Sequence, residues 1–210
     1  MRKLLALAVT ILALAAPAAP AQNFLEGVEY ESIRPQKVET RDKIEVREFF
    51  WYGCSHCYTF EPHLQKWLKR KPANAQLVRT PAVFNPQWAI HARAYYAFEA
   101  LGITDKVHEP LFAALHVERR RLMDADSIAA FVAEKGGDKK AFLEAYNSFG
   151  VQASVNRAEQ AGRAYAIEGV PVVFVDGRYM TNATLAGGYD KLTEVIDFLV
   201  RKAAAERGKF

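Results

Sequence analysis

The sequence predicts an α/β fold in which one domain is interrupted by an all-helical insertion. Five segments have the apolar or alternating pattern of strands, and they lie at 28–33, 43–52, 76–79, 172–175 and 178–181. The last two flank Asp176-Gly177, a dipeptide typical of a two-residue hairpin. Between the third and fourth strands, residues 85–166 show helical spacing alone. Strands on both sides of a long helical stretch therefore indicate a split α/β domain.

Helix signals divide the insertion into five helices. These are expected to begin at Pro86, at Thr104, after Asp124, after Asp138 and at Val151. The first start is a strong one, because Asn85 can cap the helix and proline suits its first position. The fourth helix is expected to end near Gly150 and the fifth at Ala166. Two more helices are expected outside the insertion, one from Cys54 with a kink at Pro62 and one from Tyr189.

The first 21 residues have the layout of a cleavable secretory signal. Arg2 and Lys3 precede an apolar run over 4–16, and small residues follow up to Ala21. The run is shorter than the roughly 20 residues of a membrane-spanning helix, and a retained anchor is the alternative. Cleavage would remove two basic residues and no acidic one, so the formal net charge falls from +4 to +2. With so small a charge and no basic stripe, we expect no nucleic-acid partner.

The chain has only two cysteines, Cys54 and Cys57, three positions apart. Small exported proteins often contain many disulfides, because their compartments are oxidising. A bridge that closes so short a loop removes little conformational entropy from the unfolded chain. The pair is therefore poorly suited to stabilising the fold and needs another explanation.

The Cys54-Ser55-His56-Cys57 segment follows an apolar strand and begins a helix, which favours redox chemistry. Residues one helical turn apart have Cα atoms about 5–6 Å from each other, a separation that a disulfide tolerates. Free N–H groups and the helix dipole at the first turn favour a thiolate. We therefore expect Cys54 to attack and Cys57 to resolve the mixed disulfide. His56 adds a cationic or hydrogen-bonding group near Cys54, and Ser55 keeps a backbone N–H that proline would lack.

Two other interpretations of the cysteine pair are open. It could be half of a zinc site, but such a site needs two more ligands, and the chain has no second cysteine pair and no histidines at ligand spacing. It could also be a permanently closed structural disulfide. We expect no metal and no cofactor apart from the redox-active Cys54–Cys57 disulfide.

Two further positions bear on the chemistry, and each has two interpretations. Glu48 lies on the apolar face of its strand, six residues before Cys54. There its carboxyl has a raised pKa and relays protons to Cys57, or it forms an ordinary salt bridge at the sheet margin. Val170-Pro171 precedes a buried strand, and its peptide bond is either cis in a tight turn or trans, as in about 95% of X–Pro bonds.

Three segments together closely resemble the DsbA family of periplasmic thiol:disulfide interchange proteins. They are Glu48-Phe49-Phe50-Trp51-Tyr52-Gly53-Cys54-Ser55-His56-Cys57-Tyr58, Gly169-Val170-Pro171 and Asp176-Gly177. The likeness extends over essentially the whole chain after the expected signal, including the helical insertion. It implies a thioredoxin-like fold with a mixed central sheet. Residues 22–84 and 167–210 would form the thioredoxin-like domain, and 85–166 the helical insertion and connecting helix.

The resemblance also implies roles for single residues. Cys54 matches the family's nucleophile, Cys57 its resolving cysteine and His56 the histidine that stabilises the thiolate. Val170-Pro171 matches the dipeptide with the cis bond, and Glu48 matches the buried acid below the disulfide. The implied function is donation of the Cys54–Cys57 disulfide to newly exported proteins in the periplasm. An inner-membrane, quinone-linked, DsbB-like partner would reoxidise the chain, which we expect to be a monomer.

Two details depart from the family pattern. Its commonest dipeptide between the cysteines is Pro-His, whereas this chain has Ser55-His56. Because that dipeptide tunes the redox potential, the oxidising strength is open. The family's buried lysine near the acidic residue has no clear match in residues 76–84.

Two alternative functions follow from the same residues. The first is a disulfide isomerase or reductase of the same fold, but isomerases of this kind resemble dimers with a separate N-terminal domain. Only residues 22–42 lie between the expected signal and the strand before the cysteines, too few for such a domain. The second is a non-catalytic periplasmic chaperone or binding module. Trp51 and Tyr52 would serve either as an exposed peptide-binding surface or as core residues.

Overall fold

A five-stranded mixed sheet forms the centre of the molecule. The computed structural model describes residues 23–208, so the expected signal peptide at 1–21 lies outside the described residues. The strands are β1 (Glu31–Ser32), β2 (Ile44–Phe50), β3 (Ala75–Pro81), β4 (Val172–Val175) and β5 (Tyr179–Thr181). Their order across the sheet is β1-β5-β4-β2-β3. β2 and β3 are parallel and the other neighbours are antiparallel, which confirms the mixed sheet.

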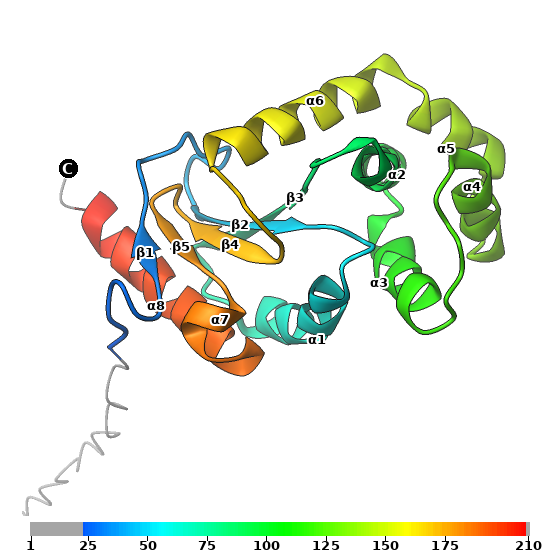
Figure 1. Cartoon of the computed structure of the whole chain (residues 1–210). Helices are drawn as coiled ribbons and strands as arrows, with labels where there is room; N and C mark the ends of the chain where they lie inside the picture. The colour runs from blue at the N-terminus through cyan, green and yellow to red at the C-terminus, as the bar shows by residue number, and fades with distance from the viewer. Residues whose placement is uncertain (1–22, 209–210) are drawn as a thin grey trace, which may run out of the picture.

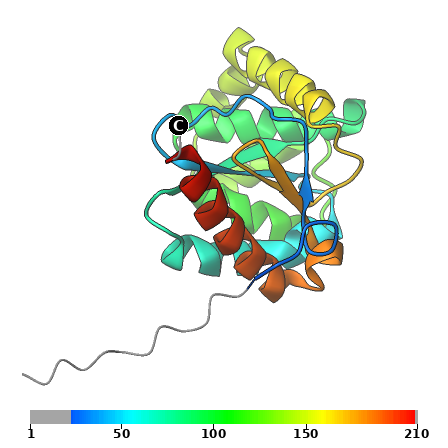
Figure 2. The same ribbon diagram turned by 90° about the vertical axis from the view of Figure 1, so that its left-hand side faces the viewer.

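Helices cover both faces of this sheet, and an all-helical unit extends from one end (Figure 1). They are α1 (Ser55–Arg70), α2 (Pro86–Leu101), α3 (Thr104–His116), α4 (Ala125–Glu134), α5 (Lys139–Tyr146), α6 (Phe149–Ala164), α7 (Ala183–Ala186) and α8 (Tyr189–Arg207). The helices α2 to α6 follow β3 and precede β4, which confirms a helical insertion in an α/β fold. Figure 2 shows α8 crossing in front of the strands.

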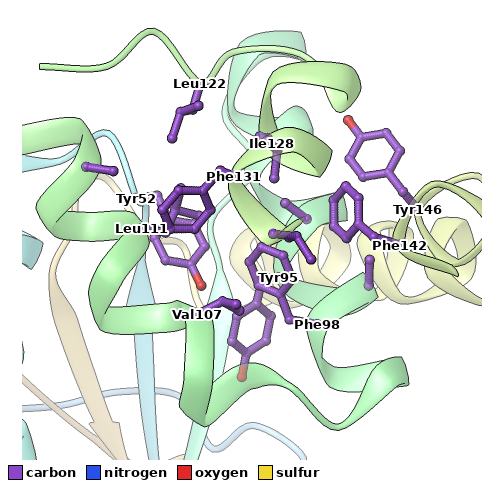
Figure 3. Close-up of a cluster of buried hydrophobic side chains, with 14 of the residues drawn as sticks. Tyr52, Tyr95, Phe98, Val107, Leu111, Leu122, Ile128, Phe131, Phe142 and Tyr146 are labelled. Atoms are coloured by element: carbon purple, nitrogen blue, oxygen red, sulfur yellow. The ribbon is translucent and has the colours of Figure 1, made fainter. Parts of the chain in front are cut away.

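Two large apolar clusters hold the parts together. One packs Val46 of β2 against Phe60 and Trp67 of α1 and Leu199 of α8. The other fills the helical insertion and continues to the end of β2 through Phe50 and Tyr52. Figure 3 shows Tyr52 lying beside Leu111 among the side chains of these helices. The residues just before the cysteines are therefore part of the core of the insertion.

The structure corrects three expectations about element limits. The first strand is only Glu31–Ser32, because Gly27, with φ +80°, starts a turn over residues 27–29, of which 28 and 29 had been expected in the strand. The helix expected to end near Gly150 ends at Tyr146, because the Ser148 side chain accepts from the Val151 N–H and caps α6. The short helix α7, capped by Asn182, had not been expected. The helix α1 is continuous from Ser55 to Arg70 and contains Pro62.

In the part of the chain that the structure describes, no helix combines the length and apolar character needed to cross a bilayer.

Candidate active site

The two cysteines lie at the start of α1 as free thiols with different exposure. Cys54 is the N-cap residue, with φ −88° and ψ 117°, and its sulfur accepts a hydrogen bond from the Cys57 N–H at 3.4 Å. Cys54 is half-buried, whereas Cys57 is only 1% exposed. A partner molecule can therefore reach the first sulfur and not the second. This geometry supports the attacking role expected for Cys54 and the resolving role expected for Cys57.

The same geometry separates the acidities of the two thiols. A hydrogen bond from the Cys57 side chain lowers the pKa of Cys54 to about 6, against the opposing effect of burial. The backbone N–H groups of Cys57 and His56 and the His56 charge contribute further to this lowering. Burial raises the pKa of Cys57 well above its usual range. At neutral pH, Cys54 is thus a thiolate and Cys57 a protonated thiol.

The loop before β4 faces the Cys54 sulfur. The Val170–Pro171 peptide bond is cis, as the resemblance implied. The Val170 carbonyl oxygen lies 3.4 Å from the Cys54 sulfur and can accept a hydrogen bond from it only when Cys54 is a protonated thiol. A cavity of about 560 Å³ runs along this loop and is bounded by His56 and Tyr189 as well as by Val170 and Pro171. Val170 therefore borders both this cavity and the Cys54 sulfur.

The two residues between the cysteines point outwards. His56 and Ser55 are both exposed on the first turn of α1. The Nδ1 atom of His56 lies 3.2 Å from the Tyr189 hydroxyl, across the mouth of the cavity. The Ser55 carbonyl oxygen accepts from the Thr59 hydroxyl at 3.0 Å. His56 therefore acts on Cys54 from the solvent side.

Glu48 lies in the centre of the sheet and is 1% exposed, so it is not at a sheet margin. Its Oε2 atom lies 3.4 Å from Nε of Arg79, on the neighbouring strand β3. Burial raises the pKa of Glu48 to about 8, although the Arg79 charge opposes this rise. The carboxyl is thus poised to gain or lose a proton near neutral pH.

Three residues of this buried site were missed from the sequence. Arg79 lies within the segment searched for a buried lysine, but an arginine occupies the position. Glu61 follows Cys57 by four residues, about one helical turn, so the two side chains lie on the same face of α1. This spacing could have identified Glu61 from the sequence. His108 comes from α3 of the insertion, and no pattern in the sequence connects it with the cysteines.

The two aromatic residues before the cysteines, Trp51 and Tyr52, differ in burial and in packing. Tyr52 is fully buried and belongs to the core of the insertion. Trp51 is half-buried and stacks on Trp88 of α2, with ring centroids 4.2 Å apart. Of the two interpretations offered for these residues, Tyr52 takes the core role.

Among residues 23–208, no group of three or more His, Cys, Asp or Glu side chains is placed to hold a metal ion. A half-buried thiolate paired with a buried thiol at a helix start, facing a cis-proline loop beside a mixed sheet, defines a thiol:disulfide oxidoreductase of thioredoxin fold.

Comparison with known proteins gives the particular family. Residues 80–196 match the DSBA-like thioredoxin domain. The chain is 41% identical over 210 residues to thiol:disulfide interchange protein DsbA of Burkholderia cepacia, covering 96% of this chain and 97% of that protein. It is 38% identical over 211 residues to DsbA of Pseudomonas aeruginosa, with both chains fully covered. This chain therefore belongs to the DsbA-like thioredoxin family.

Solved structures agree with this assignment. The crystal structure of Pseudomonas aeruginosa DsbA matches with a TM-score of 0.84 and 37% identity, over 88% of this chain and 97% of that chain. NmDsbA1 of Neisseria meningitidis matches with a TM-score of 0.78 and 26% identity, over 88% of this chain and 96% of that chain. The thioredoxin-like fold with a helical insertion is thus confirmed.

Proposed function

We propose that this chain is the periplasmic oxidase of its class, which donates the Cys54–Cys57 disulfide to newly exported proteins. As a member of its family it is a thiol:disulfide oxidoreductase that acts on substrate proteins. The observation that carries the direction of the reaction is the position of Cys54 at the N-cap of α1, where its sulfur accepts from the Cys57 N–H and its pKa is lowered to about 6. A thiolate of low pKa is a good leaving group and stabilises the reduced protein, so the corresponding disulfide is a strong oxidant.

The reaction passes through a mixed disulfide. A substrate thiolate attacks the Cys54 sulfur of the oxidised protein, and the Cys57 sulfur leaves with the electron pair of the broken bond. A second substrate thiolate then attacks the substrate sulfur of the mixed disulfide, and Cys54 leaves as a thiolate. The substrate gains one disulfide, and its two electrons remain on the dithiol form of the catalytic pair.

Glu48 is placed to handle the proton that this exchange requires. The Cys57 sulfur is buried, and its pKa is raised well above the usual range, so it leaves readily only if it is protonated. The Glu48 carboxyl is also buried, and its pKa near 8 lets it exchange a proton at neutral pH. We include this proton exchange between Glu48 and Cys57 in the proposal.

The dithiol must then be reoxidised for a further turnover. We propose that an inner-membrane, quinone-linked, DsbB-like protein does this and that the chain works as a monomer. We also propose that residues 22–84 and 167–210 form the catalytic domain and that 85–166 form the helical insertion and connecting helix. Export by the segment at 1–21 belongs to the same proposal.

Two measurements test the direction of the reaction. We expect an equilibrium reduction potential well above the value of about −270 mV for thioredoxin, and a potential near that value would contradict the oxidase function. We also expect Cys54→Ser to lose all ability to oxidise a reduced, disulfide-requiring substrate protein. Cys57→Ser should instead accumulate a mixed disulfide when it is mixed with a disulfide-bonded protein, because the Cys54 thiolate attacks that disulfide and displaces one of its sulfurs as a thiolate; a reductant should release the product. If Cys54→Ser still oxidised the substrate, the catalytic role of this pair would be wrong.

A further inference from the structure

A chain of buried polar contacts extends from the catalytic sheet into the helical insertion. Arg79 donates to Glu61 Oε1 at 2.7 Å, and its Nε lies 3.4 Å from Glu48. The other oxygen of Glu61 lies 3.4 Å from Nε2 of His108. The Nδ1 atom of His108 lies 2.7 Å from the Tyr52 hydroxyl. These five side chains come from the β2–α1 region, β3 and α3, so the contacts join the strand before the cysteines to the helical insertion.

Two carboxyl groups in this cluster share one guanidinium. Glu61 has the better partners, because Arg79 and the Gln65 amide each donate to its Oε1 atom at 2.7 Å. Glu48 has only the longer contact with Arg79, and its Oε2 has no hydrogen-bond partner among the described residues. Buried like charges cannot both be ionised at low cost, so the less well solvated carboxyl takes the proton. Glu61 is therefore the ionised member and Glu48 the protonated one.

His108 is oriented so that it supports this arrangement. It is 3% exposed, and burial lowers its pKa, so the ring is neutral and carries one N–H. The buried Tyr52 hydroxyl lies 2.7 Å from Nδ1. A proton on Nδ1 would leave the lone pair of Nε2 facing the Glu61 carboxylate, so we assign Tyr52 as the donor and place the ring proton on Nε2. That nitrogen lies 3.4 Å from Glu61 Oε2 and has no hydrogen-bond partner among the described residues, so the ionised Glu61 carboxylate is the nearest acceptor for its N–H.

We propose that His108, held in one tautomer by Tyr52, is a positioning residue that keeps Glu61 ionised and so places the single proton of the cluster on Glu48. The helical insertion thereby takes part in the redox chemistry of the thioredoxin-like domain. The inference rests on the proposed proton exchange between Glu48 and Cys57.

The other groups around the cluster do not replace His108 in this role. Tyr95 of α2 faces the His108 ring with centroids 6.1 Å apart, and burial raises its pKa, so it is neutral. Glu99 of α2 and Glu109 of α3 act on the cluster only through their charge, and neither makes a hydrogen bond with His108 or Glu61. On the side of the cysteines, the Cys54 charge acts on Glu48 and favours its protonated form. The single neutral donor aimed at Glu61 from the insertion is the ring of His108.

The test is a carbon-13 NMR titration of the glutamate carboxyl groups in the full chain, with signals assigned through Glu48→Gln and Glu61→Gln. In the unsubstituted protein we expect the Glu48 midpoint above the ordinary range and the Glu61 midpoint below it. His108→Leu removes the donor, so the two midpoints should move towards each other, each by about one pH unit or more. His108→Gln keeps a neutral amide donor and an acceptor for Tyr52, and it should restore the original separation.

The outcomes separate a positioning role from a merely structural one. Unchanged midpoints in a folded His108→Leu protein, or an equal change in His108→Gln, would overturn the proposal. If His108→Leu does not fold, Tyr52→Phe frees the tautomer, and it should move the midpoints in the same direction; no movement there would overturn the proposal as well. Because the titration does not depend on turnover, failure of the oxidase function would appear in the activity and potential measurements instead.

Discussion

The cysteines Cys54 and Cys57 are identical groups whose positions on one helical turn give them opposite properties. Cys54 caps α1 and receives backbone N–H groups, whereas Cys57 is enclosed by the core and has no access to solvent. Free N–H groups stabilise a thiolate, and an apolar enclosure stabilises a thiol. The attacking role of Cys54 and the resolving role of Cys57 thus follow from their positions, three residues apart, at the start of α1.

The first prediction concerns the Cys54 thiolate. Ultraviolet absorbance of the reduced protein should show one thiol titrating with a midpoint near 6. His56→Ala should raise that midpoint by up to about one pH unit, because it removes a charge at an exposed and screened site. His63→Ala is the matched control, since His63 lies further along α1 and pairs with Asp190. A midpoint close to 9.0, the value of an ordinary cysteine, would contradict the assigned chemistry.

At the scale of elements, the β4–β5 hairpin requires glycine at position 177 for two reasons, one in the turn itself and one in the segment around Gln36. Asp176 and Gly177 have φ of +56° and +62°, as a tight two-residue hairpin turn requires. The Gly177 carbonyl accepts from the Gln36 N–H at 2.8 Å, and a Cβ at this position would overlap the Gln36 carbonyl. The turn was evident from the sequence, but the approach of residue 36 was not.

Gly177→Ala is therefore expected to destabilise the fold by about 2–3 kcal/mol, through left-handed backbone strain and steric overlap. The matched control is Gly169→Ala, because a Cβ at Gly169 has no neighbour within 4 Å. Urea unfolding of both variants measures the difference. Equal unfolding midpoints for the two variants would show that the Gln36 segment moves aside at no cost.

The elements that were misjudged from the sequence share a physical cause. Helix and strand periodicity locates segments well, but their limits depend on single hydrogen bonds. Ser148 and Asn182 each supply a side-chain cap that starts a helix at a point which apolar spacing does not mark. Val28 has strand propensity, yet it lies in a turn that hydrogen-bonds back to Leu25 and Tyr30. Which of these local hydrogen bonds forms, and therefore where each helix or strand ends, depends on the rest of the folded chain.

For the whole molecule, the lowered pKa of Cys54 links redox state to stability. The pKa is about 6 in the folded, reduced protein and 9.0 for an ordinary cysteine, so the folded thiolate stabilises the reduced form. For a lowered pKa, this contribution is complete above pH 9.0 and is lost as the pH falls through about 6. The oxidised protein has no Cys54 thiolate and lacks the contribution.

Thermal unfolding of both redox forms tests this linkage. At pH 8 the reduced protein should melt at a higher temperature than the oxidised protein, because the short disulfide loop adds little stability of its own. At pH 5 the difference should shrink. The double variant Cys54→Ser, Cys57→Ser is the control, and its melting temperature should not respond to reductant. An equal difference in melting temperature between the reduced and oxidised proteins at both pH values would contradict the proposed contribution of the Cys54 thiolate to stability.

The split α/β order, the hairpin and the place of the redox pair at a helix start could all be predicted from the amino-acid sequence. These features depend on apolar periodicity, turn residues and spacing, which act over a few neighbouring residues. The surroundings of Glu48 depend on the fold, because Arg79 on β3 contacts both Glu48 and Glu61, and His108 on α3 contacts Glu61 in turn. The pKa of a buried carboxyl depends on which charges and donors packing brings within a few ångströms. For this reason the cysteines were evident from the sequence, and the cluster behind them was not.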